Sequence, residues 1–234
     1  TGGDMKHFTY ALALAGLLGL NAGAQAAIVS VDVDRFEEGF QNIQDTTLDS
    51  APVTDTVSLS PANGVATSRT VAINVLSYSA GATNQLTVTA DPTVSLLDVI
   101  NEVGEDSEVR VSWVIPASLI PNDAFNTFFR IAVLQSDGND LSVEFLLNGT
   151  ALGNFAVPGN TFNQDLLFTA SAAQINAGGT LEMIINGQAG WDADFDDIGF
   201  AYETPTAAPE PVSLALFGAG LIGMRRLRRR AIPA

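Results

Sequence analysis

The chain contains no cysteine and only one histidine, His7, among its 234 residues. The absence of cysteine excludes disulfide bonds, thiolate metal sites and cysteine nucleophiles. Because His7 lies close to the N-terminus, the body of the protein has no imidazole group. A Ser-His-Asp triad and a histidine-ligated zinc site are therefore excluded there.

Basic residues are scarce between Ala27 and Pro211. This stretch holds four arginines against 25 acidic residues, a balance of −21, and the only lysine, Lys6, precedes it. Such a body repels the phosphate backbones of DNA and RNA, so we expect no nucleic-acid partner. It attracts divalent cations and basic partners instead.

The N-terminal segment is typical of a secretory signal peptide. A basic start after Met5 leads into an apolar run over 8–20. Ala24 and Ala26 then form the small-x-small pattern that signal peptidase accepts. We expect a signal peptide over 5–26, and a buried hydrophobic helix is the alternative.

Three features follow one another at the C-terminus. Pro209, Glu210 and Pro211 hold the chain extended, and an uncharged apolar run covers 212–224. An apolar helix of this length spans roughly 20 Å, short of a bilayer core of about 30 Å, so arginine snorkelling and local thinning would close the gap. The arginines that follow are Arg225, Arg226, Arg228, Arg229 and Arg230. They are expected on the cytoplasmic side.

This order of a Pro-Glu-Pro motif, a short glycine-containing apolar run and an arginine cluster resembles the PEP-CTERM sorting signal. The resemblance implies recognition by exosortase, an integral-membrane protease-transpeptidase-like enzyme. It also implies a Gram-negative bacterium that makes exopolysaccharide and biofilm or floc. A plain membrane anchor with a chance Pro-Glu-Pro sequence is the alternative.

Short segments rich in β-branched and aromatic residues fill the chain between its two ends. The expected strands lie at 28–34, 69–75, 85–89, 109–114, 128–133, 142–146, 164–168, 181–185 and 195–200. Turn residues separate them, and 142–155 is typical of a hairpin around Asn148 and Gly149. A short helical turn is expected at 171–176, and 96–103 is either a short helix or a strand.

Many short strands at this spacing predict an all-β fold, an antiparallel β-sandwich of the jelly-roll type. No internal repeat and no second domain boundary is visible. The expected parts are a signal peptide at 5–26, a β-sandwich domain at 27–203, a linker with the Pro-Glu-Pro motif at 204–211, a short transmembrane helix at 212–224 and a basic cytoplasmic tail at 225–234.

Two segments of the body resemble the opening and closing strands of jelly-roll carbohydrate-binding modules and galactose-binding-like domains. They are Arg-Phe-Glu-Glu-Gly-Phe at 35–40 and Trp-Asp-Ala-Asp-Phe-Asp-Asp-Ile-Gly-Phe at 191–200. In that group a glutamate of the opening segment and an aspartate of the closing strand often share a structural calcium ion. The implied ligands are Glu37 and Asp196, with Asp45 or Asp197 as helpers.

The acidic residues of the closing segment also have a plainer interpretation. In a strand, Asp192, Asp194 and Asp196 share one face and form a solvated surface. Both interpretations, a calcium site and a solvated face, stay open at this point.

A sugar site in a sandwich usually offers exposed aromatic rings on which pyranose faces stack. Trp191 follows Gly190 at a strand start and is the candidate stacking residue, ahead of Tyr78 and Tyr202. Trp113 lies in an apolar strand and is expected in the core. Hydrolysis of glycans needs two carboxylates that face one bond, but no Glu-x-Asp-x-Glu strand is present, so we expect no enzymatic activity.

The sequence thus predicts an exported protein of the cell surface or extracellular matrix, anchored in the membrane before processing. Its expected role is structural or adhesive, within exopolysaccharide or biofilm, with calcium as a structural cofactor. Its expected partners are signal peptidase, exosortase and exopolysaccharide. The alternatives are a carbohydrate-binding module with a defined sugar site and a glycan-cleaving enzyme.

Overall fold

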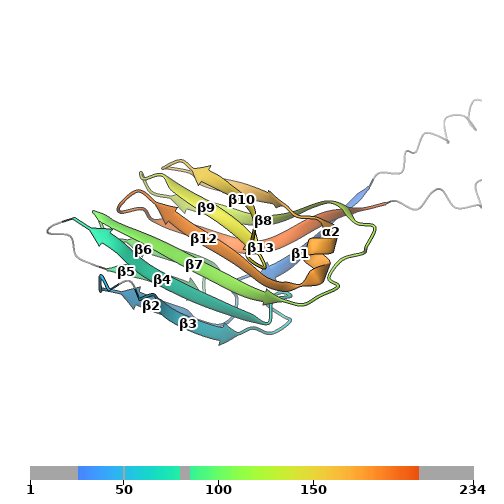
Figure 1. The fold of residues 1–234 in the computed structure, drawn as a ribbon, viewed down its shortest axis with the longest axis horizontal. Helices are drawn as coiled ribbons and strands as arrows, with labels where there is room; N and C mark the ends of the chain where they lie inside the picture. Colours follow the sequence, from blue (N-terminus) through green and yellow to red (C-terminus); the bar gives the residue numbers. More distant parts are fainter. Residues whose placement is uncertain (1–25, 50, 80–84, 206–234) are drawn as a thin grey trace, which may run out of the picture. The chain divides into compact units, whose positions relative to one another are not determined.

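The computed structural model describes residues 26–49, 51–79 and 85–205 (Figure 1). Apart from Ala26, the predicted signal peptide lies outside the described residues, as do the Pro-Glu-Pro motif, the predicted transmembrane helix and the basic tail. In the part of the chain that the structure describes, no helix is long and apolar enough to cross a membrane.

The chain from Ile28 to Thr204 forms one compact unit built almost entirely from β-strands. The predicted all-β antiparallel sandwich is therefore confirmed. The strands are β1 (Ala27–Asp34), β2 (Gln41–Asp45), β3 (Val53–Ser58), β4 (Ser68–Tyr78), β5 (Leu86–Asp91), β6 (Leu96–Asn101), β7 (Glu105–Ile115), β8 (Phe125–Ser136), β9 (Leu141–Leu147), β10 (Thr150–Val157), β11 (Phe162–Thr169), β12 (Gly179–Gly187) and β13 (Ala193–Thr204).

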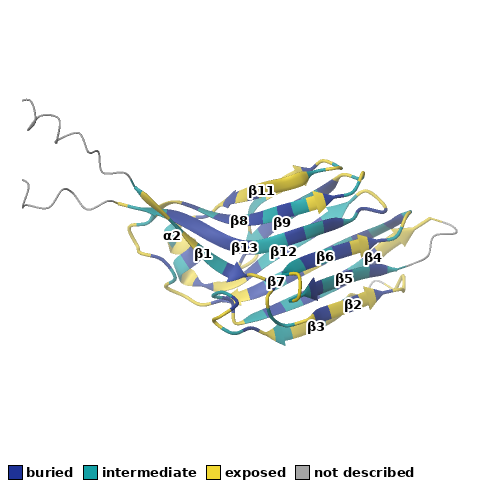
Figure 2. Cartoon of the chain, turned by 180° about the vertical axis from the view of Figure 1, so that it is seen from behind, coloured by how far each residue is buried: buried dark blue, intermediate teal, exposed yellow. Residues whose placement is uncertain are grey.

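The strands form two sheets. Sheet A has the order β11-β8-β13-β6-β5-β2, with β1 paired to β13, and sheet B has the order β10-β9-β12-β7-β4-β3. Figure 1 is seen from the side of sheet B and Figure 2 from the side of sheet A. In sheet A the last strand, β13, lies between β8 and β6, so segments far apart in the sequence meet on this sheet.

Alternate side chains of each strand point into the space between the sheets. In β7 the inward residues Val109, Val111 and Trp113 are fully buried, whereas the residues between them are partly or fully exposed. The predicted place of Trp113 in the core is thus confirmed. Burial of each large apolar side chain stabilises the fold by about 1.5–3 kcal/mol.

Local sequence explains the turns and the one short helix. Asn148 and Gly149 join β9 to β10 with φ angles of 52° and 74°, the left-handed values that a tight hairpin requires, so the predicted hairpin is confirmed. The predicted helical turn is α2 (Ala172–Ala177). It begins at a capping box in which the Ser171 side chain accepts from Gln174 N and the Gln174 side chain accepts from Ser171 N.

The sequence analysis did not predict two of the strands, and it left one segment open between helix and strand. The segment 96–103 contains a strand, β6, and no helix. The edge strand β3 and the short edge strand β2 were not predicted, because Val-Thr-Asp-Thr-Val-Ser and Gln-Asn-Ile-Gln-Asp hold few apolar residues. Edge strands of a sheet commonly look polar in this way.

A fully buried arginine fastens the opening segment to sheet B. Arg69 of β4 donates from Nη1 to Asp34 Oδ2 at 2.8 Å and from Nε to Gln41 Oε1 at 2.7 Å. Its Nη2 donates to the backbone carbonyls of Glu38 and Gly39. One guanidinium group therefore holds the whole turn between β1 and β2.

Asp34, the partner of Arg69, is itself completely satisfied. Its Oδ2 also accepts from Trp113 Nε1 at 2.7 Å, and its Oδ1 accepts from Phe36 N at 2.8 Å and Asn63 Nδ2 at 2.6 Å. A buried carboxylate with this many donors is compensated in full. Removal of Arg69 would leave the buried charge of Asp34 without its cationic partner.

Candidate functional site

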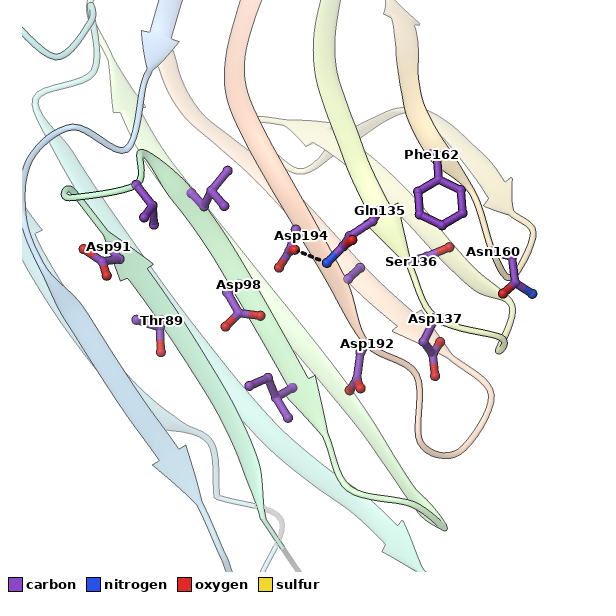
Figure 3. Close-up of a pocket in the computed structure, with 14 residues that line it drawn as sticks. Thr89, Asp91, Asp98, Gln135, Ser136, Asp137, Asn160, Phe162, Asp192 and Asp194 are labelled. Carbon is purple, nitrogen blue, oxygen red and sulfur yellow. Dashed lines mark hydrogen bonds between the residues drawn. The ribbon is translucent and has the colours of Figure 1, made fainter.

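A groove of about 660 Å³ lies on the outer face of sheet A (Figure 3). Strands β5, β6, β13 and β8 form its floor, and the segment that leads into β11 borders it. Its lining residues are Thr89, Asp91, Val94, Leu96, Asp98, Ile100, Gln135, Ser136, Asp137, Asn160, Phe162, Asp192, Ala193 and Asp194. None of these residues is basic, and five are aspartates.

The antiparallel register of β6 and β13 creates the acidic centre of the groove. Asp98 lies directly opposite Asp194, and Val99 lies opposite Ala193. Since side chains alternate between the faces of a sheet, the buried Leu97 and Val99 point into the core while Asp98 points outward into the groove. Gln135 of β8 donates from Nε2 to Asp194 Oδ2 at 2.6 Å (Figure 3).

Asp98 is protonated more easily than an ordinary aspartate. The pKa of Asp98 is raised to about 6, first by burial, then by its hydrogen bond with Asp194 and by the negative charges of Asp194 and Asp192. Burial likewise raises the pKa of Asp192, although the Asn101 N–H group donates to its Oδ1 at 2.7 Å. The groove therefore takes up a proton more readily than exposed aspartates do.

Apolar side chains border this acidic floor. Phe162, the first residue of β11, is 65% exposed, and Val94 and Ile100 are also exposed. Figure 3 shows the Phe162 ring on the far side of Gln135 from Asp98. The groove thus combines an open aromatic face with amide and carboxylate groups, which is the usual composition of a site for polyhydroxylated ligands.

The sequence analysis missed Phe162 for a specific reason. Regular alternation along β11 would place Phe162 on the same side as Leu166 and Phe168, which are both buried. Asn163 has a left-handed φ of 49°, which interrupts the alternation, and Phe162 is exposed opposite Gln135. An asparagine inside a strand was the available signal.

The predicted stacking role of Trp191 is wrong. Trp191 is fully buried and belongs to the hydrophobic core, so neither face of its ring is open to a sugar. Tyr202 is buried as well, and Tyr78 is exposed at the end of β4, outside the groove. The two preceding residues, Ala189 and Gly190, allow the chain to turn inward here; Gly190 has a φ of 78°.

The predicted calcium ligands are not gathered into a group. Glu37 is exposed, and its backbone N–H group donates to Asn63 Oδ1 at 2.9 Å. Asp196 Oδ1 accepts from the backbone of Asp197, at a register shift in the pairing of β13 with β8. Among the described residues no group of three or more histidine, cysteine, aspartate or glutamate side chains is placed to hold a metal ion. A calcium site at Glu37 and Asp196 stays a prediction.

Arginines supply the positive charge near these residues. Asp197 accepts from Arg130, and Asp32 accepts from Arg35 Nε at 2.6 Å. Burial raises the pKa of Asp197 and the Arg130 charge opposes this rise. Of the three aspartates expected on one strand face, Asp192 and Asp194 do line the groove, whereas Asp196 does not.

Asp98 and Asp194 present two carboxyl groups from adjacent strands on the floor of the groove. Carboxylates accept hydrogen bonds from hydroxyl groups, and glycosidases also use a pair of carboxyl groups that face one bond. The absence of enzymatic activity stays a prediction.

No protein-family model matches the chain, and no curated protein does either. Among solved structures, it is similar to a CBM61 carbohydrate-binding module in complex with β-1,4-galactotriose, with 10% identity over 69% of this chain and 86% of that one and a TM-score of 0.30. A CBM36 carbohydrate-binding module in complex with calcium and xylotriose is 17% identical over 46% of this chain and 79% of that one, with a TM-score of 0.23.

A third similar structure is the pair of CBM22-1 and GH10 modules of the Clostridium thermocellum xylanase 10B, complexed with xylohexaose. It is 14% identical over 78% of this chain and 29% of that chain, with a TM-score of 0.29. Similarities this weak assign neither a family nor a ligand to the chain.

Proposed function

We propose that the chain is a glycan-binding β-sandwich protein whose ligand lies in the groove on the outer face of sheet A. The observation that carries this proposal is the exposed ring of Phe162 beside a row of hydrogen-bonding side chains in a groove of about 660 Å³. Pyranose rings stack on aromatic faces through their C–H groups, and their hydroxyl groups need acceptors and donors nearby.

The polar groups of the groove match the hydroxyl groups of a sugar chain. Carboxylates such as Asp91 and Asp192 only accept hydrogen bonds, whereas the amides of Gln135 and Asn160 both donate and accept. The floor crosses four adjacent strands, which at about 4.8 Å per strand spacing is long enough for several linked sugars. The five aspartates favour neutral or cationic glycans over anionic ones because like charges repel.

The wider role that we propose is adhesive or structural, at the cell surface or in the extracellular matrix. The support is the sequence of the two ends: a signal peptide, then the Pro-Glu-Pro motif, apolar run and arginine cluster that resemble the PEP-CTERM signal. Signal peptidase and exosortase would process the chain, and exopolysaccharide or biofilm would be the setting in which the groove binds. A structural calcium ion belongs to this proposal, because an acidic body attracts divalent cations.

The proposal is tested by retention of the full chain on immobilised polysaccharides. Retention that depends on Phe162 would support it. A glycan-cleaving activity is a separate possibility, and release of reducing ends from the retained polysaccharide would reveal it.

A further inference from the structure

A cluster of buried polar side chains lies at one end of the sandwich, and none of its members lines the glycan groove. We call Asp45, Asn101, Glu105 and Ser107 the end cluster. All four are at most 3% exposed. They come from the last residues of β2 and β6 and the first residues of β7, and Figure 1 shows these strand ends at the same end of the molecule. Buried positions of a sandwich are normally apolar, so this concentration needs a reason.

The Asp45 side chain of sheet A forms a hydrogen bond to sheet B. Its Oδ2 accepts from the backbone N–H group of Val75 in β4 at 3.0 Å. Val75 is the cross-strand partner of Ser107 in β7. The Asp45 carboxylate therefore lies beside the strand pair that carries Ser107, and Glu105 follows two residues away on the same, inward face of β7.

Glu105 of sheet B forms the reverse contact, from its side chain to the backbone of sheet A. Its Oε2 accepts from Gln85 N at 2.7 Å, at the start of β5 in sheet A. The next residue, Leu86, pairs with Asn101 on one side and Asp45 on the other. Asn101 also donates from Nδ2 to the Glu105 backbone carbonyl at 2.8 Å. The Glu105 carboxyl group thus contacts sheet A at the start of β5, the strand that lies between β2 and β6.

Three oxygen atoms of the end cluster have no hydrogen-bond partner. They are Glu105 Oε1, Asn101 Oδ1 and Ser107 Oγ, and they account for three of the five buried unpaired side-chain atoms in the described residues. Native proteins pair nearly all buried polar atoms with protein, water or an ion. All three can act as acceptors, so a cation or a hydrogen-bond donor is the kind of partner that they lack.

Charge favours a cation as that partner. Asp45 and Glu105 are both acidic, and no ion pair to either is formed among the described residues. Two buried carboxylates that lack a cationic partner favour a bound positive ion.

We propose that the end cluster binds one hard divalent cation, with Ca²⁺ the expected ion, through Glu105 Oε1, Asn101 Oδ1 and Ser107 Oγ. Asp45 supplies the second negative charge. The donor set is oxygen only, which suits calcium and not zinc or copper. The ion would tie β6 of sheet A to β7 of sheet B, and the site is distinct from the sequence-predicted ligands Glu37 and Asp196.

Thermal unfolding of the full chain in excess CaCl₂ and in EDTA tests this site. At a calcium concentration a hundredfold above the dissociation constant, the melting temperature of the wild type should rise by about 5–10 °C. Glu105→Gln keeps the side-chain shape and should abolish the rise. Asp196→Asn and Asp123→Asn are the matched controls, and both should respond to calcium as the wild type does.

Glu105→Gln removes a repulsion, so in EDTA it should melt at or above the wild-type temperature, which also shows that the variant folds. If it does not fold, Ser107→Ala serves, and its calcium affinity by titration calorimetry should fall at least tenfold. The proposal is overturned if calcium leaves the wild-type melting temperature unchanged. It is equally overturned if Asp196→Asn abolishes the rise, or if neither end-cluster variant weakens calcium binding.

Discussion

Asp98 of β6 and Asp194 of β13 lie directly opposite each other, and the negative charge of Asp194 helps to raise the pKa of Asp98. Like charges directly opposite in a sheet are destabilising. The pair therefore lowers the stability of the fold, and it lies at the centre of the groove in which we place the ligand. Its protonation should be visible in the stability of the fold.

Asp98→Asn is expected to raise the free energy of unfolding at pH 7 by about 1 kcal/mol, with the partial exposure of the carboxyl group taken into account. The pKa of Asp98 is about 6 in the fold against an ordinary 3.8. The folded state thus binds the proton more tightly, and stability falls as pH rises through this interval. The gain from Asp98→Asn should be largest above pH 6 and should shrink toward pH 4 in thermal unfolding.

Asp123→Asn is the control for this change, because Asp123 is exposed and lies outside the groove. It should leave the pH dependence of the melting temperature as it is in the wild type. A gain from Asp98→Asn that is the same at pH 4 and pH 7 would contradict the assignment.

Arg69→Met is expected to lower the free energy of unfolding by about 3–5 kcal/mol, because it leaves the buried charge of Asp34 uncompensated. The matched control is Arg110→Met. Arg110 is about half exposed and pairs with Glu108 and Glu182 on the surface, so its loss should cost at most about 1 kcal/mol. Urea unfolding measures the free energy of unfolding of both variants. Equal losses would contradict the stabilising role of the buried Arg69–Asp34 pair.

Trp191 should behave as a core residue. Trp191→Ala is expected to cost about 3–5 kcal/mol of unfolding free energy, as large-to-small changes in a core do. The milder Trp191→Phe should fold and should retain glycan binding. Loss of glycan binding in a folded Trp191→Phe protein would instead restore a role for this residue in the site.

The tail makes a prediction of its own. In a Gram-negative host that expresses an exosortase, the full chain should yield a product shortened near Pro209-Glu210-Pro211, seen by mass spectrometry. Glu210→Ala should accumulate the longer form. An equal change at Glu203, upstream of the motif, should have no effect. Unchanged processing in Glu210→Ala would favour a plain membrane anchor.

The sequence predicted those parts of the fold that depend on local pattern. The strand at 109–114 was evident because its apolar residues alternate and face one core, as β7 confirms. The hairpin at Asn148 was evident because its turn chemistry is local. The edge strand β3 was missed because one polar, weakly packed strand carries little pattern.

The groove could not be predicted in the same way. It depends on which strands become neighbours in sheet A, and the pairing of β6 with β13 joins segments that are far apart in the sequence. Trp191 was expected to be exposed and Phe162 was overlooked, because local backbone turns at Gly190 and Asn163 decide which way each ring faces. Such turns show in a sequence only as single residues with several interpretations.

The most direct measurement is binding of the full chain to a panel of immobilised polysaccharides, with wild type, Phe162→Ala and Phe40→Ala compared. Phe40 is the control, since it is also well exposed but lies outside the groove. The account predicts that the wild type is retained on at least one glycan. Phe162→Ala should bind that glycan with an affinity at least about tenfold lower, and Phe40→Ala should bind it as the wild type does. Retention of no glycan by the wild type, or equal retention of Phe162→Ala, would contradict it.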